Sequence, residues 1–508
     1  MGERAHVEAG RVRVETLILG AGFGGVGAAI RLTRAGLGDF LILERAADVG
    51  GTWRDNTYPG AACDIPSNLY SFSFAQNPEW SRAYSGSAEI LQYVQRLVDE
   101  HQLRPRIRFQ QNVSHMRFDE RAGEWEVRTD TGSVFRARSV ISATGGLANP
   151  GYPAIEGRER FAGKTIHSAR WDHGYDFAGK RVAVIGTGAS AVQIIPELVK
   201  VAGSVKVFQR TPGWVVPRPD YRVPERQKAR FRRNPAAQTA ARQALFWGHE
   251  SSALAVIWPS PLTRVAEGIA SAHLRRQVQD PWLRRQLTPN FRIGCKRVLL
   301  SSDYYPALQQ PNCKLITWPI VRIGEHGVHT AEGVEHQVDC VVFATGFEVH
   351  KQSTPFPVVG LGGRVLADEW RGGAQAYKSM NVTGFPNLHF ILGPNSGPGH
   401  NSALVYMESQ IDYAVQGVRT LAETGARFLD VRPEVQQRYN EGLQKRLAKT
   451  NWASGCKSWY LTADGFNATM YPGFATQYAQ ELRHFQRGDY HAAPAAGAAD
   501  RAGLALQT

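Results

Sequence analysis

Two glycine-rich turns constrain the fold of this chain more than any other feature. The first, Gly20-Ala-Gly22-Phe23-Gly-Gly25, follows an apolar run at residues 14–19 and precedes a stretch with the apolar spacing of a helix. In such a turn the first glycine permits a tight bend, the second lets the backbone approach a pyrophosphate, and the third lets the helix pack on the strand. The helix N-terminus then faces the phosphates with its partial positive charge. The order strand, turn, helix predicts a dinucleotide-binding unit.

The second turn repeats this order in the middle of the chain. It lies between a strand-like run at residues 181–185 and an apolar helical stretch, and it contains Gly186, Thr187, Gly188, Ser190 and Ala191. Alanine stands in the place of the third glycine, a replacement that this turn tolerates. Two such units predict an α/β fold with two Rossmann-like dinucleotide-binding domains.

The two units end their second strands on residues of opposite charge. Glu44 and Arg210 each lie 24 residues beyond the first glycine of their own turn. A carboxylate at this place accepts hydrogen bonds from ribose hydroxyls and repels a 2′-phosphate, so the first unit should hold FAD or NAD. A guanidinium suits a phosphate, so the second should hold NADPH, with Arg210 and Thr211 at the 2′-phosphate. An arginine that merely ends a strand is the alternative.

The segment after the first unit has the character of a cofactor loop. It is rich in glycine and aromatic residues, and its candidate cofactor contacts are Gly51, Thr52, Trp53, Tyr58, Asp64 and Tyr70. A flavoprotein needs an irregular loop with an aromatic wall around the isoalloxazine ring. The alternatives are ordinary loop packing for Trp53 and Tyr58, and a helix or turn cap for Asp64.

A third segment, at residues 161–172, lies just ahead of the second unit. Phe161, Gly163, His167 and Trp171 follow one another at spacings of two, four and four residues, and an acid comes next. No helical or strand period produces this pattern, so amphipathicity does not explain it. Alone, the segment would read as a linker with one buried aromatic residue.

At these two segments the chain resembles the type I Baeyer–Villiger monooxygenases of the class B flavoprotein monooxygenase superfamily. The family patterns FxGxxxHxxxW, followed by Pro or Asp, and GGxWxxxxYPGxxxD are met at every fixed position. The resemblance implies an enzyme that uses FAD, NADPH and O2. It implies conversion of a ketone to an ester or lactone through a C4a-peroxyflavin.

The same resemblance assigns roles to a basic pair further on. Lys296 would help to hold the 2′-phosphate, and Arg297 would lie over the flavin as the catalytic cation, held in place by Asp64. An arginine keeps its proton in proteins, so it can stabilise developing negative charge. His167 and Trp171 would tie together the linker between the domains. Asn401 and Ser402, at the start of a later helix, are further candidate contacts for an anion or the flavin edge.

We expect a discontinuous domain organisation. Residues 14–150 and 347–490 would form the FAD-binding domain, 151–216 and 291–346 the NADP-binding domain, 217–290 a helical insertion, and 491–508 a disordered tail. The insertion is expected because successive helical stretches there are separated by prolines.

Other functions remain open at this point. A flavin-containing monooxygenase that oxidises sulfur or nitrogen, with a sulfide as substrate, has a similar linker but ends it in Tyr or Phe where this chain has Trp171. A nucleotide-binding protein without turnover would keep both glycine turns but would not need Asp64 and Arg297 together.

Bulk properties exclude further classes. The chain has 508 residues and a formal charge of +14, which suits a basic enzyme with polyanionic cofactors; no nucleic-acid signature accompanies the charge. Five cysteines without a CxxC pair argue against a disulfide framework, a zinc site and a dithiol centre, so we expect no metal. No secretory signal and no transmembrane segment are recognisable, which predicts a cytoplasmic protein, either monomer or homodimer.

Overall fold

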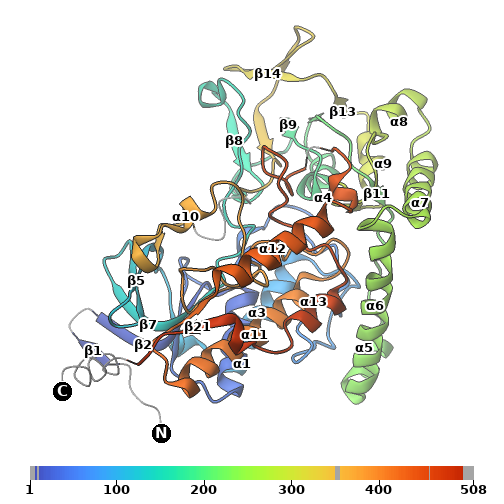
Figure 1. Ribbon diagram of the computed structural model, residues 1–508. Helices are drawn as coiled ribbons and strands as arrows, with labels where there is room; N and C mark the ends of the chain where they lie inside the picture. The colour runs from blue at the N-terminus through green and yellow to red at the C-terminus, as the bar shows by residue number, and fades with distance from the viewer. Residues whose placement is uncertain (1–5, 9–10, 349–354, 457, 496–508) are drawn as a thin grey trace, which may run out of the picture.

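The computed structural model describes residues 6–8, 11–348, 355–456 and 458–495. Figure 1 shows two lobes with a helical arm beside them. The lower lobe combines the N-terminal segments, blue to cyan through β7, with the orange-red C-terminal segments, and the upper lobe is built from the green and yellow middle of the chain. Two segments far apart in the sequence therefore share one lobe.

The lower lobe is organised around a nine-stranded sheet. Strands β2 (Arg11–Leu19), β3 (Phe40–Leu43) and β4 (Ile107–Arg108) are parallel, and β7 (Val134–Ser142) runs parallel to β2 on its other side. Strands β5 (Val113–Asp119) and β6 (Glu124–Thr129) continue from β7 as an antiparallel meander. Three further strands complete the sheet: β1 (His6–Glu8), β18 (Val358–Val359) and β19 (Leu388–Phe390).

Both faces of this sheet are covered, as strands with continuous apolar runs require. Along β2, Ile18 belongs to the core under the helices, whereas Leu17 and Leu19 belong to the core on the opposite face. The helical face carries α1 (Phe23–Arg34), α3 (Ser87–Glu100), α11 (Ala403–Thr424), α12 (Pro433–Leu447) and α13 (Ala475–Glu481). Helix α1 is buried along most of its length, which agrees with its run of small and apolar residues.

The upper lobe contains a five-stranded, wholly parallel sheet in the order β13-β10-β9-β17-β8. Its strands are β8 (Lys164–His167), β9 (Arg181–Ile185), β10 (Ser204–Phe208), β13 (Cys313–Ile316) and β17 (Cys340–Phe343). Helices α4 (Ala189–Leu198) and α9 (Tyr304–Leu308) pack on it. The predicted α/β class with two dinucleotide-binding units is confirmed.

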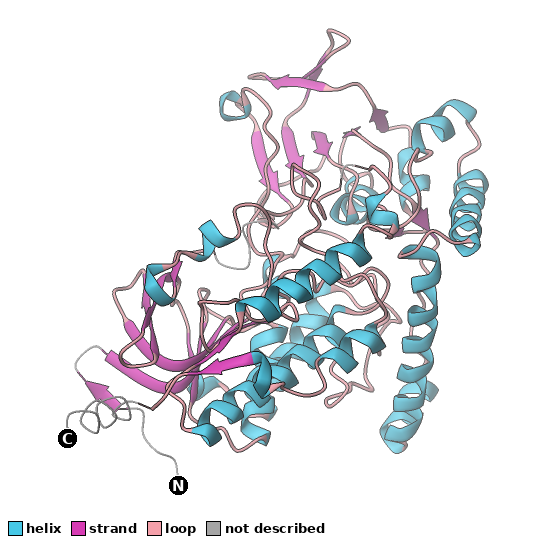
Figure 2. Ribbon diagram, in the orientation of Figure 1, coloured by secondary structure: helices cyan, strands magenta, loops and turns pink. Residues whose placement is uncertain are grey.

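The helical arm consists of α5 (Glu225–Arg233), α6 (Pro235–Val256), α7 (Pro261–Gln277) and α8 (Pro281–Leu287). Figure 2 shows these helices at one side of both lobes. Proline stands at the first position of α6, α7 and α8, where its missing N–H costs nothing and its fixed φ favours the helix.

Shorter elements connect these parts. The helices are α2 (Thr52–Asp55), η1 (Arg104–Arg106), η2 (Arg158–Arg160), η4 (Leu361–Gly363), α10 (Leu366–Glu369), η5 (Asn451–Ala453) and η6 (Arg487–Asp489). The strands are β11 (Val215–Val216), β12 (Leu299–Leu300), β14 (Ile320–Ile323), β15 (Gly327–Thr330), β16 (Glu335–Gln337), β20 (Leu429–Val431) and β21 (Tyr490–Ala492). No helix in the described ranges is long and apolar enough to cross a membrane.

The prediction of a disordered tail from residue 491 begins too early. His491 and Ala492 belong to β21, which pairs antiparallel with β20, and Ala493 is buried. The small residues in this stretch resemble a low-complexity tail in the sequence, but backbone hydrogen bonds between β20 and β21 order His491 and Ala492. Residues 496–508 of the predicted tail lie outside the described part of the chain.

Candidate active site

The first glycine turn is held by contacts that leave no room for a side chain. Gly20 has φ +101°, and a Cβ on it would lie 2.6 Å from the carbonyl oxygen of Ala143. A Cβ on Gly25 would lie 1.8 Å from the carbonyl oxygen of Gly20. The first and third glycines of the motif are therefore required by backbone packing, as their spacing predicts.

The second glycine of this turn forms one wall of a cradle. A Cβ on Gly22 would meet the Cα of Gly51 at 3.5 Å, and Gly51 itself has φ +53°. Thr52 and Trp53 follow directly in the short helix α2. Two backbones without side chains face each other here, at the N-terminus of α1. This arrangement is the kind of cradle that a pyrophosphate fills.

Glu44 is more enclosed than a ribose ligand needs to be. Its side chain is only 5% exposed, and it accepts hydrogen bonds from the backbone N–H of Ala21 at 2.8 Å and of Ala46 at 2.9 Å. Arg54 also donates to it at 3.0 Å. The Glu44 carboxylate thus holds the backbone of the glycine turn through its bond to Ala21. Contact between Glu44 and a ribose stays a prediction.

The aromatic residues of the cofactor loop pack on one another. Trp53 donates its indole N–H to the Tyr70 hydroxyl at 3.1 Å, and their ring centroids lie 5.5 Å apart. Phe23 is buried and contacts Tyr70 and Phe72 edge to face. The predicted aromatic wall is therefore preassembled. The Phe23 side chain lies within the core, so only its backbone is available to a phosphate.

The same loop joins the two nucleotide-binding units. Tyr58 donates its hydroxyl to the side-chain oxygen of Gln193 on α4 at 3.0 Å, and Gln193 donates back to the carbonyl of Ala62. Gly60, with φ +77°, lies so close to α4 that a Cβ would be 2.6 Å from the Gln193 carbonyl oxygen. The loop is thereby docked on the helix that follows the second glycine turn.

The second turn has the same construction. Gly186 has φ +115°, and a Cβ there would lie 2.4 Å from the Ala344 carbonyl oxygen. Gly188 faces open space, since a Cβ on it would meet no atom within 4 Å, whereas Ala191 is fully buried. The Thr187 hydroxyl donates to the carbonyl of Thr211 at 3.1 Å. Ser190 lies in the first turn of α4.

Two cations meet beside the second turn. Burial lowers the pKa of Lys296, and the positive charge of nearby Arg210 lowers it further. The Lys296 ammonium also lies 4.8 Å from the centre of the Phe291 ring. Repulsion between like charges favours a bound anion between them. Contact of these two residues with a phosphate stays a prediction.

Asp64 and Arg297, 233 residues apart in the sequence, form an ion pair. The guanidinium donates to Asp64 Oδ2 from Nη2 at 2.6 Å and from Nε at 2.8 Å. The negative charge of Asp64 raises the pKa of Arg297 above its usual value. The Arg297 side chain is 37% exposed, so its remaining N–H groups stay accessible. A permanently charged and oriented cation thus stands at the end of the docked loop.

The third segment is partly a strand. Lys164–His167 forms β8 at the edge of the upper sheet, paired with β17. Phe161 packs into the core below, and a Cβ on Gly163 would lie 2.5 Å from the Asp339 carbonyl oxygen. Trp171 stacks on Phe177 at 5.3 Å. These three residues shape the upper lobe.

His167 lies where the chain passes between the lobes. Gly151 donates its N–H to the Gly346 carbonyl at 2.8 Å, which joins the outgoing and returning connections. His167 packs against Tyr152 and Phe347 on these connections. Burial lowers its pKa to about 4, so the ring is neutral near pH 7. The role of tying the linker stays a prediction for His167, whereas Trp171 packs on Phe177 within the upper lobe.

The prediction for Asn401 and Ser402 is not supported, because both side chains are buried and engaged within the protein. Asn401 donates to Glu250 at 2.9 Å, and the Ser402 hydroxyl accepts from the N–H of Leu404 as the N-cap of α11. Glu250, from α6, is the anion that the Asn401 side chain contacts. It also accepts from the side chain of His400 and from the backbone and hydroxyl of Thr476.

The cysteine prediction is also wrong in one respect. Cys295 and Cys456 form a disulfide across 161 residues, with their Cα atoms 6.2 Å apart. Cys63, Cys313 and Cys340 are unpaired. Wide spacing argued against a disulfide framework, and it gave no sign of this pair, which the fold brings together next to Lys296.

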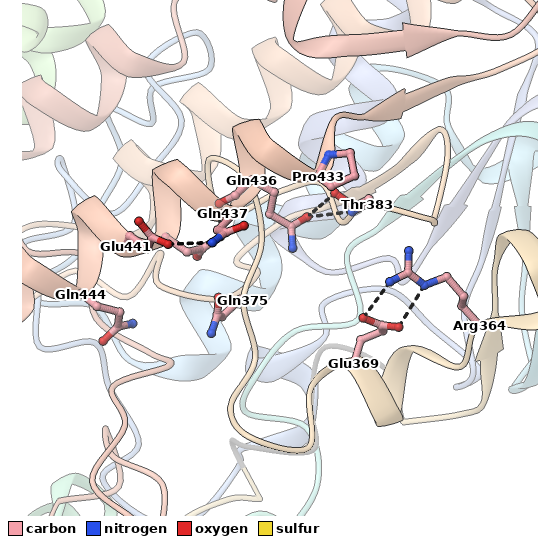
Figure 3. Close-up of a pocket in the computed structure, with 10 residues that line it drawn as sticks. Arg364, Glu369, Gln375, Thr383, Pro433, Gln436, Gln437, Glu441 and Gln444 are labelled. Atoms are coloured by element: carbon pink, nitrogen blue, oxygen red, sulfur yellow. Dashed lines mark hydrogen bonds and ion pairs between the residues drawn. The ribbon is translucent and has the colours of Figure 1, made fainter.

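A separate pocket lies in the lower lobe, between α12 and the segment that carries Arg364 and Thr383. It has a volume of about 530 Å³ and is lined by amide and charged side chains (Figure 3). Arg364 and Glu369 form an ion pair at its edge, 3.0 Å apart. None of the predicted site residues lines it.

Sequence reasoning missed two residues that shape the site. Gln193 docks the loop on α4. Tyr460 lies buried near Arg297: burial raises the pKa of Tyr460 to about 12, and the charge of Arg297 counteracts part of that rise. Gln193 gave no signal, because it is one polar residue in an apolar helix. Tyr460 belongs to an aromatic-rich stretch in which no single residue stands out by its spacing.

These observations fit two dinucleotides. The Gly22–Gly51 cradle at the start of α1 suits the pyrophosphate of FAD, and the aromatic wall suits its ring system. The Arg210–Lys296 pair beside the second turn suits the 2′-phosphate of NADPH.

Comparisons with known proteins agree with this. The profile of a family described as pyridine nucleotide-disulphide oxidoreductase matches residues 17–242, which include both glycine turns. A Baeyer–Villiger monooxygenase of Streptomyces coelicolor is 44% identical over 94% of this chain and 92% of its own length. Another, from Pseudomonas aeruginosa, is 42% identical over 93% of this chain and 90% of its own.

Solved structures give the same result. An oxidised steroid monooxygenase bound to NADP is similar with a TM-score of 0.84 and 29% identity, covering 95% of this chain and 99% of that one. Cyclohexanone monooxygenase from Rhodococcus sp. Phi1 bound to NADP+ has a TM-score of 0.84 and 28% identity, with the same coverage.

Proposed function

Because this chain belongs to the Baeyer–Villiger monooxygenases, we propose that Arg297, oriented by Asp64, is the cation that drives its oxygenation of a ketone. The enzyme is an FAD- and NADPH-dependent monooxygenase that performs Baeyer–Villiger oxidation, as the sequence resemblance implies. The observation that carries the residue assignment is the Asp64–Arg297 ion pair at 2.6 Å, at the end of the loop docked between the two nucleotide-binding units.

When bound, FAD supplies hydride acceptance from NADPH and the activation of O2. The protein's own groups place and tune the reactants. Gly20, Gly22 and Gly25, with Gly51 opposite, receive the first dinucleotide, and the Gly186 turn receives the second. Arg210 and Lys296 hold the 2′-phosphate, and Thr211, the residue after Arg210, assists them.

Arg297 acts on charge that develops during oxygenation. Nucleophilic addition to a ketone places negative charge on the carbonyl oxygen, and a fixed guanidinium stabilises that charge without reorganising solvent. Loss of one such preorganised donor typically lowers a rate about 10²- to 10³-fold. Arginine suits this role because it does not deprotonate when water is excluded.

Asp64 acts through Arg297. Both short contacts to its Oδ2 come from one edge of the guanidinium, Nε and Nη2. This leaves Nη1 to point away from the carboxylate. Because the guanidinium is planar, this contact also fixes the direction in which Nη1 donates. Asp64 is a positioning residue by this argument.

We propose the division of the chain given by its connections: residues 14–150 and 347–490 bind FAD, 151–216 and 291–346 bind NADP, and 217–290 form an insertion. The pairing of β18 and β19 with the first sheet supports the return of the chain to the first domain. We further propose a small-molecule ketone as the substrate and a cytoplasmic monomer or homodimer, because cells regenerate NADPH in the cytoplasm.

A panel of cyclic, linear and aryl ketones tests this function. The purified enzyme with FAD, NADPH and O2 should consume NADPH in step with a product that carries one added oxygen atom, identified as an ester or lactone by mass spectrometry. Sulfides and tertiary amines serve as the comparison substrates. Efficient oxidation of those, with no ester from any ketone, would contradict the proposal.

A further inference from the structure

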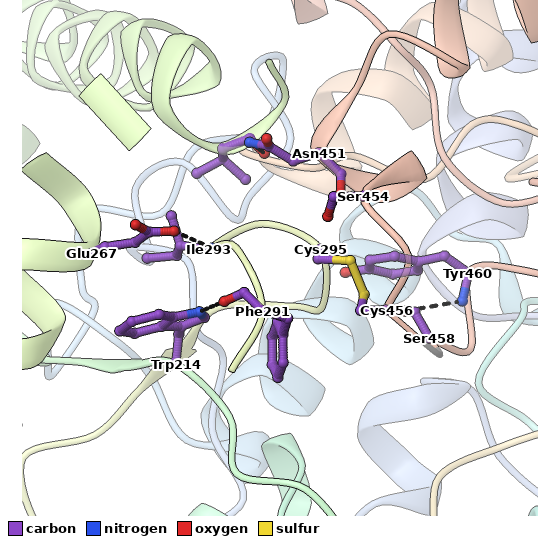
Figure 4. Close-up of a disulfide and its surroundings, with 11 residues drawn as sticks. Trp214, Glu267, Phe291, Ile293, Cys295, Asn451, Ser454, Cys456, Ser458 and Tyr460 are labelled. Atoms are coloured by element: carbon purple, nitrogen blue, oxygen red, sulfur yellow. Dashed lines mark hydrogen bonds between the residues drawn. A yellow bond between two sulfur atoms is a disulfide. The ribbon is translucent and has the colours of Figure 1, made fainter. Parts of the chain in front are cut away.

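The Cys295–Cys456 disulfide joins the catalytic segment to a surface loop. Cys295 is fully buried and immediately precedes Lys296 and Arg297, whereas Cys456 is half-buried. Figure 4 shows the bond bridging these two parts of the chain, with Tyr460 close by. None of the functions assigned above uses this bond.

The segment on the Cys295 side is anchored without the disulfide. Trp214 donates its indole N–H to the carbonyl of Phe291 at 2.7 Å, and Leu299 donates its N–H to the carbonyl of Trp214. The N–H of Ile293 donates to Glu267 at 3.0 Å. These contacts hold the segment before and after Lys296 and Arg297, so it keeps its path when the sulfur–sulfur bond opens.

Among its described residues, the loop on the Cys456 side is anchored at its two ends. Trp452 and Tyr460 are buried, and Asn451 donates to the carbonyl oxygens of Ile257 and Val256 at 2.7 and 3.0 Å. Between these anchors, the hydrogen bonds that the structure describes join neighbours within residues 450–461, such as Ser454 with Asn451. Trp459 is 45% exposed. The disulfide thus ties the middle of this loop to the body of the protein.

We propose that Cys295–Cys456 is a reversible thiol–disulfide modification site. Its state sets how firmly the loop that contains Cys456 and Trp459 is held beside the segment carrying Lys296 and Arg297. Its reaction partners are low-molecular-weight thiols or dithiol proteins in one direction and their disulfides in the other. In the cytoplasmic location proposed above, a disulfide is usually a transient or redox-sensing one, which agrees with such a use.

The order of the exchange follows from the burial of the two residues, since Cys295 is fully buried and Cys456 is half-buried. A thiolate attacks the more accessible Cys456 Sγ, forms a mixed disulfide there and releases Cys295 as a thiolate. A second thiol then attacks the mixed disulfide. Two protein thiols and one external disulfide result, so two electrons pass from the external thiols to the protein. Cationic residues follow Cys295 directly, and positive charge near a leaving thiolate favours its release.

Reduction releases the loop and leaves the anchored segment in place. The oxidised enzyme should therefore present a more ordered wall beside Lys296 and bind NADP+ more tightly, because less chain must be ordered on binding. This effect on NADP+ rests on the function proposed above for Lys296. The thiol chemistry and the release of the loop do not depend on it.

Thiol counting tests the modification site directly. Protein purified without reductant should be incubated with reduced and oxidised glutathione at varied ratios, then denatured and alkylated. Three cysteines should be labelled in the oxidised state (Cys63, Cys313 and Cys340) and all five after reduction, with the change reversed by oxidised glutathione. Five labelled cysteines at every ratio, or a pair that glutathione opens only after unfolding, would refute the proposal.

Limited proteolysis tests the release of the loop. Chymotrypsin should cut after Trp459 on the order of tenfold faster in the reduced protein, since cleavage follows the population of the open loop. Cys456→Ser, or Cys295→Ser as a second variant, should be cut at the fast rate in both conditions. Cys313→Ser, which removes an unpaired cysteine, should respond to glutathione like the wild type.

Equal cleavage of the oxidised and reduced protein would overturn the proposed control of the loop.

NADP+ binding, measured by calorimetry, should be roughly three- to tenfold weaker in the reduced protein. Faster cleavage with unchanged NADP+ affinity would instead contradict the role given to Lys296, so the two proposals fail in distinguishable ways.

Discussion

Removal of Arg210 should change the cofactor preference of this enzyme. Arg210 is solvent-exposed at the end of the second unit's second strand, and its charge lowers the pKa of Lys296. The two cations have each other as neighbours, and a 2′-phosphate between them relieves their repulsion. Arg210→Ala should therefore weaken NADPH binding and leave NADH binding almost unchanged.

The expected loss of NADPH affinity follows from the solvent exposure of Arg210. Hydrogen bonds to charged groups contribute about 1.5–3 kcal/mol, and the lower end applies to an exposed, solvent-screened side chain. About 1.5 kcal/mol corresponds to roughly a tenfold loss of affinity. Because salt screens exposed charges, the difference between NADPH and NADH should narrow as ionic strength rises.

Steady-state Michaelis constants for NADPH and NADH, with dissociation constants for NADP+ and NAD+, measure this preference. Arg322→Ala is the matched control, because Arg322 is an exposed arginine of the same lobe, on β14. It removes the same net charge and should affect neither cofactor. Equal losses for NADPH and NADH in Arg210→Ala would refute the assignment of Arg210 to the 2′-phosphate.

Three further predictions concern stability and assembly. Burial raises the pKa of Glu250, but its hydrogen bonds outweigh this and lower the pKa from 4.5 to about 2. The ionised Glu250 therefore contributes about 3 kcal/mol to the free energy of unfolding above pH 4.5, and this contribution is lost as pH falls toward 2. The difference in unfolding free energy between wild type and Glu250→Gln should shrink between pH 4.5 and pH 2. Gly25→Ala should abolish flavin uptake, read from flavin absorbance per chain, because its Cβ would strike the Gly20 carbonyl, whereas Gly248→Ala, in open space on α6, should retain it. Tyr58→Phe should keep the fold and lower its unfolding free energy by about 0.5–1.5 kcal/mol, measured by denaturant titration, through loss of one hydrogen bond to α4.

The parts of the fold that depend on local chain geometry were predictable. Glycines at Gly20 and Gly186 are required by left-handed φ values and close backbone contacts, which a strand–turn–helix pattern implies. The Asp64–Arg297 pair was expected only through the family resemblance, because no spacing rule links residues 233 positions apart.

Errors arose where a partner comes from elsewhere in the chain. The start of α11 looks like an anion site in the sequence, but Asn401 donates to Glu250 of α6 and Ser402 caps the helix itself. Cysteine spacing detects nearby pairs, and it could not detect Cys295 with Cys456. The end of the chain looked disordered because its residues are small, although pairing with β20 orders His491.

Asp64→Ala should be milder than loss of the cation itself. Arg297 would keep its charge and lose only its orientation, so ketone oxygenation should fall by less than in Arg297→Ala. Since Asp64 acts through Arg297, the double variant should be no slower than Arg297→Ala alone. Rate losses that multiply in the double variant would indicate that Asp64 has a separate role.

The rate of ester formation by Arg297→Ala, measured apart from flavin reduction, tests the central claim most directly. FAD should remain bound, and oxygenation of a ketone by enzyme already reduced with NADPH should fall at least about a hundredfold. Arg371→Ala, a surface arginine 81% exposed, should behave like the wild type. Ester formation by Arg297→Ala at the wild-type rate would contradict the account and would leave Lys296 as the next cation to test.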